Sequence, residues 1–310
     1  MLAIETRNLT KCYGSLMAVD SINLEIPSGA LFVLIGPNGA GKTTTIRMLA
    51  GLLEPSSGEI LLDGAVTNAD APEFRRQIGY MPDFFGVYED MLVWEYLDFF
   101  ARCYDLPSAR RDQVTTELLE LVDPAPKRDD YVEDLSRGMR QRLCLAHALV
   151  HDPQILLLDE PASGLDPRAR VEMRELLQAL GAMGKTVIVS SHILAELDEL
   201  CDSIGIIELG KLVASGPIEM ISRQTRGGRL LQVRTLSARP DVQAFFTNHP
   251  EVSNIYEHED RLEVEFRGND EAVAGLLKQV VEAGIQVIAF SEISNDLEDV
   301  FLKLTEGHST

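Results

Sequence analysis

The sequence predicts an α/β fold built around a phosphate-binding loop, followed by a small α+β domain of ferredoxin-like type. Apolar stretches of strand length at residues 31–35, 155–158 and 186–191 are separated by stretches of helical spacing. A glycine-rich segment at residues 36–43 joins the first of these strands to a helix. After residue 226, short alternating apolar patterns are mixed with helical ones, which indicates a second domain.

Residues 36–43 fit the phosphate-loop pattern G-x-x-x-x-G-K-[ST], between a buried strand and the helical stretch 44–50. Glycines allow successive backbone N–H groups to point inward at phosphate oxygens, where the positive end of the helix dipole also favours an anion. Lys42 is expected to reach the β and γ phosphates, and the Thr43 hydroxyl to hold Mg²⁺. The predicted nucleotide contacts are Gly36, Pro37, Asn38, Gly39, Ala40, Gly41, Lys42, Thr43 and Thr44.

Composition restricts the partners of this chain. Its 310 residues are enough for two domains, and 45% hydrophobic with 25% charged residues is typical of a soluble globular protein. The net charge of −21 argues against a nucleic-acid partner and against adsorption to an anionic lipid surface. Because no apolar run approaches the ~18 residues of a membrane helix, we expect no direct membrane insertion, and any membrane role must use a partner protein.

The four cysteines are widely scattered and form no C-x-x-C pair. Such spacing predicts reduced thiols in a cytosolic protein.

The N-terminal segment reads as two strands, at residues 2–8 and 19–26. Tyr13 lies between them, next to a glycine. A tyrosine at such a place is often a packing residue, but its position ahead of a phosphate loop favours a flat ring that stacks on adenine.

Residues 59–64 read as a short strand, and residues 78–83 as a strand that runs into a loop ending at Asp83. From about 84 to 150 helical patterns rich in aromatics predict a helical subdomain. Its stretch 93–101 is apolar around more of its circumference than one core-facing stripe requires. The excess is either an interaction surface or the core of the subdomain itself.

A second helix start lies at residues 135–143. Ser136 is a good N-cap, and the apolar residues that follow keep helical spacing. With Gly138 beside it, this helix start is a second candidate anion site.

Two adjacent carboxylates, Asp159 and Glu160, end the apolar strand that begins at residue 155. Side chains alternate along a strand, so the two acids are expected to have different roles. In a phosphate-loop enzyme the aspartate at the strand end holds Mg²⁺, which leaves Glu160 to act as general base toward the attacking water. The alternative is a solvated pair of acids with no shared function.

His192 ends the strand that begins at residue 186. Parallel sheets bind ligands at the carboxyl edge of their strands, so His192 is expected to contact the γ-phosphate rather than to be a structural histidine.

Together these motifs resemble the nucleotide-binding subunit of ATP-binding cassette (ABC) transporters over about residues 1–222. The resemblance implies a P-loop NTPase ABC cassette with a helical subdomain, with ATP and Mg²⁺ as cofactors and Lys42, Glu160 and His192 as catalytic residues. It also implies a head-to-tail homodimer, with each ATP between the phosphate loop of one subunit and Ser136 and Gly138 of the other. ATP binding would close this dimer and hydrolysis would open it, driving a membrane-spanning transporter subunit.

The chain departs from the family pattern at two places. Family members usually carry Gln where Asp83 stands, and we expect Asp83 still to serve Mg²⁺ and the coupling to the partner, since carboxylates suit that ion. The family signature L-S-G-G-Q reads L-S-R-G-M at residues 135–139, which retains Ser136 and Gly138. An Arg and a Met at these places occur in the subgroup that this chain most resembles, the drug-export type whose ATPase is a separate polypeptide.

We place the domain boundary at residues 226 and 227, giving an ATPase domain 1–226 and an accessory domain 227–310. A strand-helix-strand-strand-helix-strand order, with one helix added after Asn295, predicts the ferredoxin-like unit. It holds no catalytic or metal-binding constellation and resembles the accessory domain found after many export-type cassettes. We expect dimer contact or regulation, with ligand sensing as the alternative.

The leading hypothesis is an ATP-hydrolysing subunit that powers a membrane transporter, an exporter rather than an importer. It would be cytoplasmic, held at the inner face of the cell membrane by its partner. One alternative is a soluble ABC-type ATPase that remodels a ribosome or a nucleic-acid complex. The other is a regulatory protein that binds ATP without turnover.

Overall fold

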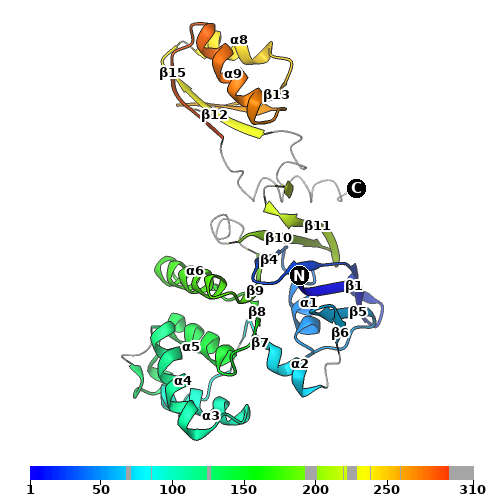
Figure 1. Ribbon diagram of the computed structural model, residues 1–310, viewed down its shortest axis with the longest axis vertical. Helices are drawn as coiled ribbons and strands as arrows, with labels where there is room; N and C mark the ends of the chain where they lie inside the picture. The colour runs from blue at the N-terminus through cyan, green and yellow to red at the C-terminus, as the bar shows by residue number, and fades with distance from the viewer. Residues whose placement is uncertain are drawn as a thin grey trace. The chain divides into compact units, whose positions relative to one another are not determined.

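The computed structural model describes residues 1–67, 71–84, 86–123, 127–192, 201–218, 220–221, 229–237, 239–258 and 260–292. The chain forms two compact units, Met1–Gly216 and Pro217–Thr310 (Figure 1). The boundary predicted at 226 and 227 lies outside the described residues.

An antiparallel sheet forms the N-terminal part of the first unit. Its strand order is β2-β1-β5-β6, and β3 also pairs with β1. The strands are β1 (Leu2–Tyr13), β2 (Leu16–Ile22), β3 (Glu25–Pro27), β5 (Ser57–Leu62) and β6 (Ala65–Val66).

The strand bounds predicted at 2–8 and 19–26 are wrong. The first strand continues to Tyr13, and the second is broken into β2 and β3. At the break, the buried hydroxyl of Thr6 donates to the carbonyl of Ile22 (2.9 Å) and accepts from the amide of Leu24 (2.8 Å). The Thr6 hydroxyl thus bridges the two segments on either side of the break, which no periodicity in the sequence indicates.

A six-stranded sheet follows, in the order β11-β10-β4-β9-β8-β7. Neighbours from β10 to β7 pair in parallel, so their carboxyl ends share one edge. The loop after β4, Glu160 after β8, His192 after β9 and Asp83 after β7 therefore meet at that edge, as the predicted parallel sheet requires. The strands are β4 (Leu31–Ile35), β7 (Ile78–Met81), β8 (Ile155–Asp159), β9 (Thr186–Ser191), β10 (Ser203–Glu208) and β11 (Lys211–Pro217).

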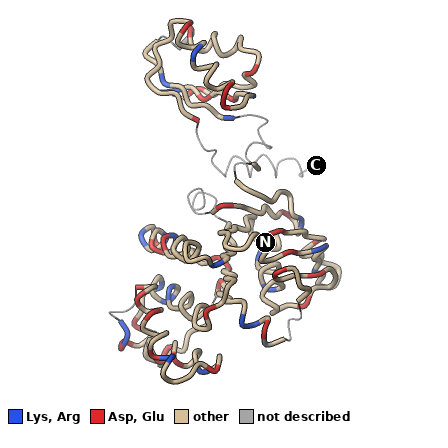
Figure 2. Tube along the Cα trace, viewed as in Figure 1, with Lys and Arg blue, Asp and Glu red and all other residues tan. Residues whose placement is uncertain are grey.

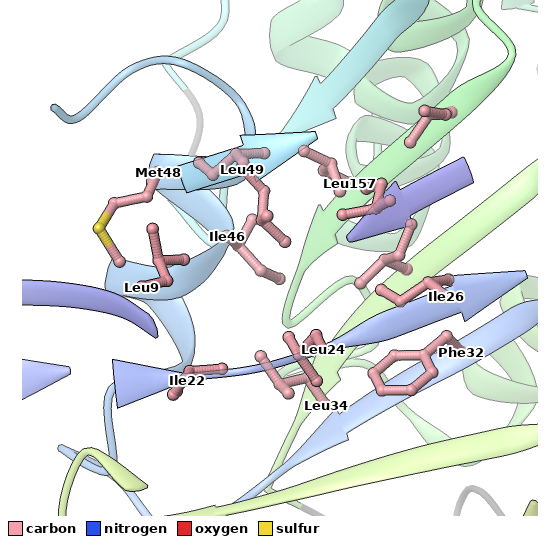
Figure 3. Packing of buried hydrophobic residues seen from close by; sticks show 14 of the residues in the cluster. Leu9, Ile22, Leu24, Ile26, Phe32, Leu34, Ile46, Met48, Leu49 and Leu157 are labelled. Atoms are coloured by element: carbon pink, nitrogen blue, oxygen red, sulfur yellow. The ribbon is translucent and has the colours of Figure 1, made fainter. Parts of the chain in front are cut away.

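The main core lies around helix α1 (Lys42–Leu49), between strands of the two sheets (Figure 3). Burial of these apolar side chains fixes the start of α1, and with it the loop that precedes the helix. The labelled core residues are Leu9, Ile22, Leu24, Ile26, Phe32, Leu34, Ile46, Met48, Leu49 and Leu157.

Helices α3, α4 and α5 group together in the first unit (Figure 1). Helix α3 buries Val93, Tyr96 and Leu97 but leaves 37% of Phe99 exposed, so it supplies both a core and an aromatic surface. Besides α1, the described part of this unit contains α2 (Pro72–Gln77), α3 (Val93–Cys103), α4 (Ser108–Leu121), the short helix η2 (Val132–Asp134), α5 (Arg137–Leu149) and α6 (Pro167–Ala182).

His147 of α5 packs among aromatic rings of α3. Its ring stacks on Phe100 at a centroid distance of 3.6 Å and meets Tyr96 edge-on. Burial, and then the nearby His151, lower the pKa of His147 to about 4. The ring is therefore neutral in the folded protein at any pH near neutrality, whereas the unfolded chain binds a proton near pH 6.5.

The first prediction concerns acid stability. Because the folded-state pKa of His147 is depressed, its contribution to the unfolding free energy is complete above about pH 6.5 and is lost as pH falls toward 4, by about 3 kcal/mol. His147→Leu should flatten the pH dependence of urea unfolding in this window. The single tryptophan, Trp94, lies in α3 and reports on this part of the unit by fluorescence. The prediction would be contradicted if the unfolding free energy of the variant fell with pH between 6.5 and 4 as steeply as that of wild type.

The second unit has the chain order predicted for it. It contains β12 (Arg229–Thr235), α8 (Arg239–Thr247), β13 (Val252–Glu257), β14 (Leu262–Phe266), α9 (Asp270–Glu282) and β15 (Val287–Glu292). The strands pair antiparallel in the order β13-β14-β12-β15, over a core that includes Phe246, Phe266 and Leu276. The helix predicted after Asn295 lies outside the described residues.

Helices long and apolar enough to cross a membrane are absent from the described part of the chain.

Candidate nucleotide-binding site

A cavity of about 560 Å³ opens at the carboxyl edge of the parallel sheet. Its volume lies in the range of small-molecule sites. The residues that line it come from β1 and β2, from the loop after β4 and the start of α1, and from the ends of β7, β8 and β9. They are Tyr13, Leu16, Ala18, Asn38, Gly39, Gly41, Lys42, Thr43, Thr44, Asp83, Glu160, Ser163 and His192.

Glycines hold the phosphate loop close to its neighbours. A Cβ on Gly36 would lie 2.2 Å from the carbonyl oxygen of Ile207 in β10. Gly41 has φ of +110° and approaches the carbonyl of Ala18 so closely that a Cβ would lie 2.6 Å from it. Only glycine allows both the close approach and the backbone conformation. Gly36, Pro37 and Ala40 form the base of the loop and do not line the cavity.

Lys42 is 5% exposed, yet its ammonium group is fully engaged. Its Nζ donates to the carbonyls of Gly36 (2.7 Å) and Pro37 (3.2 Å) and lies 3.4 Å from Oε1 of Glu160. A positive charge is thus held directly beneath the loop, where an anionic ligand would meet it.

Asp159 is fully buried at the end of β8. Its Oδ1 accepts hydrogen bonds from Thr43 Oγ1 (3.0 Å) and Ser190 Oγ (2.7 Å). Its Oδ2 is buried without a hydrogen-bond partner among the described residues. A buried carboxylate oxygen that lacks a donor is costly, so this atom is suited to a hard cation.

Glu160 lies between two basic side chains. Its backbone has φ of +51°, rare for a residue with a side chain, and its amide donates to Ser190 Oγ (2.9 Å). Its Oε2 is 2.7 Å from Nδ1 of His192, and Oε1 faces Lys42. Because a carboxylate only accepts, Nδ1 of His192 is the donor, which leaves Nε2 for another contact.

Tyr13 is half exposed at the end of β1 and lines the cavity. The Nζ of Lys11 lies 5.6 Å from the centroid of its ring and donates to the carbonyl of Glu54. The side chain of Lys11 thus links the ring to the segment after α1. Asp83, also exposed, lines the same cavity.

The predicted signature residues lie apart from this cavity. Ser136 caps α5, as predicted, with its Oγ accepting from the amide of Met139 (3.3 Å). Gly138 faces α6, where a Cβ would lie 3.2 Å from Cβ of Ala169. Neither residue lines the cavity.

Two serines of the site were not assigned to it from the sequence. Ser190 bonds both to the Asp159 carboxylate and to the Glu160 amide, and Ser163 lines the cavity. A polar residue within the apolar stretch 186–191 is the signal by which Ser190 could have been found.

This arrangement of a phosphate loop, a buried strand-end aspartate and a neighbouring glutamate on a parallel sheet defines a phosphate-loop nucleotide-binding domain. The chain belongs to the ABC transporter family. The family described as "ABC transporter" matches residues 19–163, and the one described as "ATP-binding protein DrrA1-3-like, C-terminal domain" matches residues 216–305.

Curated relatives agree with this assignment. The chain is 35% identical to the bacitracin transport ATP-binding protein BcrA of Bacillus licheniformis over 305 residues, which cover 98% of this chain and 97% of BcrA. It is 41% identical to the Nod factor export ATP-binding protein I of Cupriavidus metallidurans over 222 residues, 71% of this chain and 73% of the relative.

Solved structures resemble a large part of the chain. An ATP-binding subunit of an ABC transporter has a TM-score of 0.64 at 33% identity and covers 72% of this chain and 93% of its own. A dimeric post-hydrolysis state of the cassette MJ0796 bound to ADP and Pi has a TM-score of 0.63 at 25% identity. The match covers 69% of this chain and 98% of the MJ0796 chain.

ATP-binding proteins of this family hydrolyse ATP to power transport and work with membrane permease partners. The predicted fold, family and ATPase activity are therefore confirmed, and the alternative of a soluble remodelling ATPase is not favoured.

Proposed function

We propose that this chain binds Mg²⁺-ATP in the cavity and, as a homodimer, drives export through a membrane-spanning partner from the cytoplasmic face of the membrane. One observation carries the proposal: the cavity brings the phosphate loop, Glu160 and His192 together at one edge of the sheet.

Lys42 would bind the β and γ phosphates, because its buried ammonium group already lies against the loop. Thr43 and Asp159 would hold Mg²⁺, together with Asp83, which lines the same cavity as Thr43. The unpartnered Oδ2 of Asp159 and the nearby Thr43 hydroxyl fit an ion that prefers oxygen ligands. Bound Mg²⁺ would neutralise charge that develops on the phosphates.

Glu160 would act as general base toward the attacking water. His192 donates to one carboxylate oxygen of Glu160 and so fixes its orientation, while its Nε2 is left to contact the γ-phosphate. In the structure Lys42 pairs with Glu160, so bound phosphates would compete with Glu160 for the ammonium group and release the carboxylate for the water.

Tyr13 would stack on the adenine ring. Stacking of a base on an aromatic side chain contributes about 1–3 kcal/mol, so Tyr13→Ala should raise the Kd for ATP about tenfold. Tyr13→Phe should stay within about twofold, because the ring and not the hydroxyl makes the contact. Titration with a fluorescent ATP analogue measures both variants, and a Phe variant as weak as the Ala variant would contradict the stacking role.

The homodimer would complete the site. Ser136 and Gly138 lie outside the cavity of their own chain, so they are available to a nucleotide held by a second copy. The helix start at Ser136 presents backbone N–H groups suited to an anion. A resembling cassette was solved as a dimer, which supports the same assembly here.

The membrane partner would dock in a groove of the helical part of the first unit. The groove has a volume of about 580 Å³ and is lined by Val87, Tyr88, Glu89, Asp90, Met91 and Phe99. It begins only a few residues after Asp83, and the rings of Tyr88 and Phe99 meet edge-on at 5.6 Å. Aromatic and acidic side chains together suit an amphipathic partner segment with apolar and basic residues.

Capture from detergent-solubilised host membranes tests this docking. Tagged wild type should retain a stoichiometric polytopic membrane protein, and Phe99→Ser should lose most of it while keeping its basal ATPase activity. Val171→Ser is the matched control, because Val171 is a similarly exposed apolar residue on α6. Equal capture by Phe99→Ser and wild type would place the partner elsewhere, and capture of ribosomal proteins alone would contradict the transporter role.

Export is the direction that the relatives favour, since one is named for export and another for bacitracin transport. Acidic residues are spread over both units (Figure 2), which disfavours a nucleic-acid partner. A host strain lacking this chain should become more sensitive to an exported antibiotic, with bacitracin as the first compound to test, and Glu160→Gln should not restore resistance.

A further inference from the structure

Arg137 stands where the family pattern usually has a glycine, and its side chain reaches a second functional loop. Its Nη2 donates to the carbonyl of Ser163 at 3.0 Å. It also packs against Gly164, because a Cβ built on that glycine would lie 2.3 Å from Nη2 and 2.4 Å from Cζ. Gly164 has φ of +67°, a conformation that favours glycine, and its missing side chain leaves room for the guanidinium to lie against the loop.

The loop that Arg137 contacts also carries the proposed general base. The amide of Ser163 donates to the carbonyl of Glu160 at 3.0 Å, which closes a tight turn between them. Glu160 and Ser163 both line the ATP cavity. Arg137 therefore holds the Ser163 end of this turn, and the Glu160 end of the same turn positions the carboxylate.

The neighbours of Arg137 in sequence have a different role. Ser136 and Gly138 lie outside the cavity of their own chain and, in the proposed dimer, face the nucleotide of the other chain. A displacement of the start of α5 moves the backbone of Arg137 with it, since Arg137 is the first residue of that helix.

We propose that Arg137 is a positioning residue that couples the two nucleotide sites of the dimer. Engagement of one chain's signature residues by ATP bound to the other chain is transmitted through the guanidinium to the turn that bears Glu160. This inference rests on the proposed homodimer. It assigns the coupling to a side chain that the usual family signature lacks.

The test measures steady-state ATPase rates against ATP concentration for the full chain. Wild type should show a Hill coefficient above 1, with two as the ceiling for two sites. Arg137→Met should lower the Hill coefficient to about 1 and kcat about fivefold to tenfold, with KM changed less than about twofold, because the lost contact acts on the base and not on ATP binding. Arg137→Lys should recover part of the Hill coefficient and part of kcat, since an ammonium group can still donate to one carbonyl.

Arg168→Met is the matched control, because Arg168 is largely exposed on α6 and pairs with Glu172 one turn further along the same helix. It should show the Hill coefficient and kcat of wild type.

A separate measurement, sedimentation of Glu160→Gln with Mg²⁺-ATP, tests the dimer itself. Absence of a dimer would overturn both the proposed assembly and the coupling. If the dimer forms, the coupling is overturned by a wild-type Hill coefficient of 1, or by Arg137→Met with wild-type cooperativity. A lower melting temperature with unchanged cooperativity would also overturn it, since that marks a structural role only.

Discussion

Replacing Glu160 by Gln is expected to lower kcat for ATP hydrolysis by at least about 100-fold while leaving ATP binding intact. The carboxamide can still accept the hydrogen bond from Nδ1 of His192, so the geometry of the site should survive. What it cannot do is take a proton from the attacking water. With hydrolysis blocked, the ATP-bound dimer should accumulate. Phosphate release gives the rate, and sedimentation in the presence of Mg²⁺-ATP gives the dimer.

The matched control is Glu172→Gln, which removes a carboxylate charge on α6 and disturbs its pairs with Arg142 and Arg168. Its kcat should remain near that of wild type. Residual activity of Glu160→Gln within about tenfold of wild type would show that another group activates the water.

Lys42→Met should weaken ATP binding about 100-fold. Hydrogen bonds to charged groups contribute about 1.5–3 kcal/mol each, and about 3 kcal/mol corresponds to a factor of about 100 in Kd. The variant removes the cation of the loop and leaves the carbonyls of Gly36 and Pro37 without the donor that they have in wild type. Calorimetric titration with ATP measures the loss.

Lys185→Met is the matched control for Lys42→Met, since Lys185 is another buried lysine, bonded to Asp152 and to the carbonyl of Pro153. It should lose stability as Lys42→Met does, but keep its Kd for ATP within about twofold. If both variants lost ATP affinity equally, the effect would come from unfolding and not from a phosphate contact.

Much of the site could be predicted because its residues lie at the ends of strands. The pattern of residues 36–43 fixes a loop between a strand and a helix, and Asp159, Glu160 and His192 each follow an apolar stretch. Parallel pairing then brings their carboxyl ends to one edge without further information.

The features that could not be predicted from the sequence depend on contacts between segments that lie far apart in the chain. The hydroxyl of Thr6 breaks the second strand by bonding to residues more than fifteen positions away, and periodicity carries no sign of it. Ser190 is set between Asp159 and Glu160 by the register of two parallel strands. The contact of Arg137 with Gly164 similarly arises only when α5 and the loop after β8 are brought together.

The most direct test of the whole account is the ATPase rate of the purified chain, measured alone and together with its captured membrane partner in lipid vesicles. We predict measurable turnover by the chain alone, a severalfold increase in kcat with the partner, and neither in the Glu160→Gln variant. ATP binding without turnover under both conditions would contradict the account and identify a regulatory protein. Turnover that responds to ribosomes but to no membrane protein would identify a soluble remodelling ATPase.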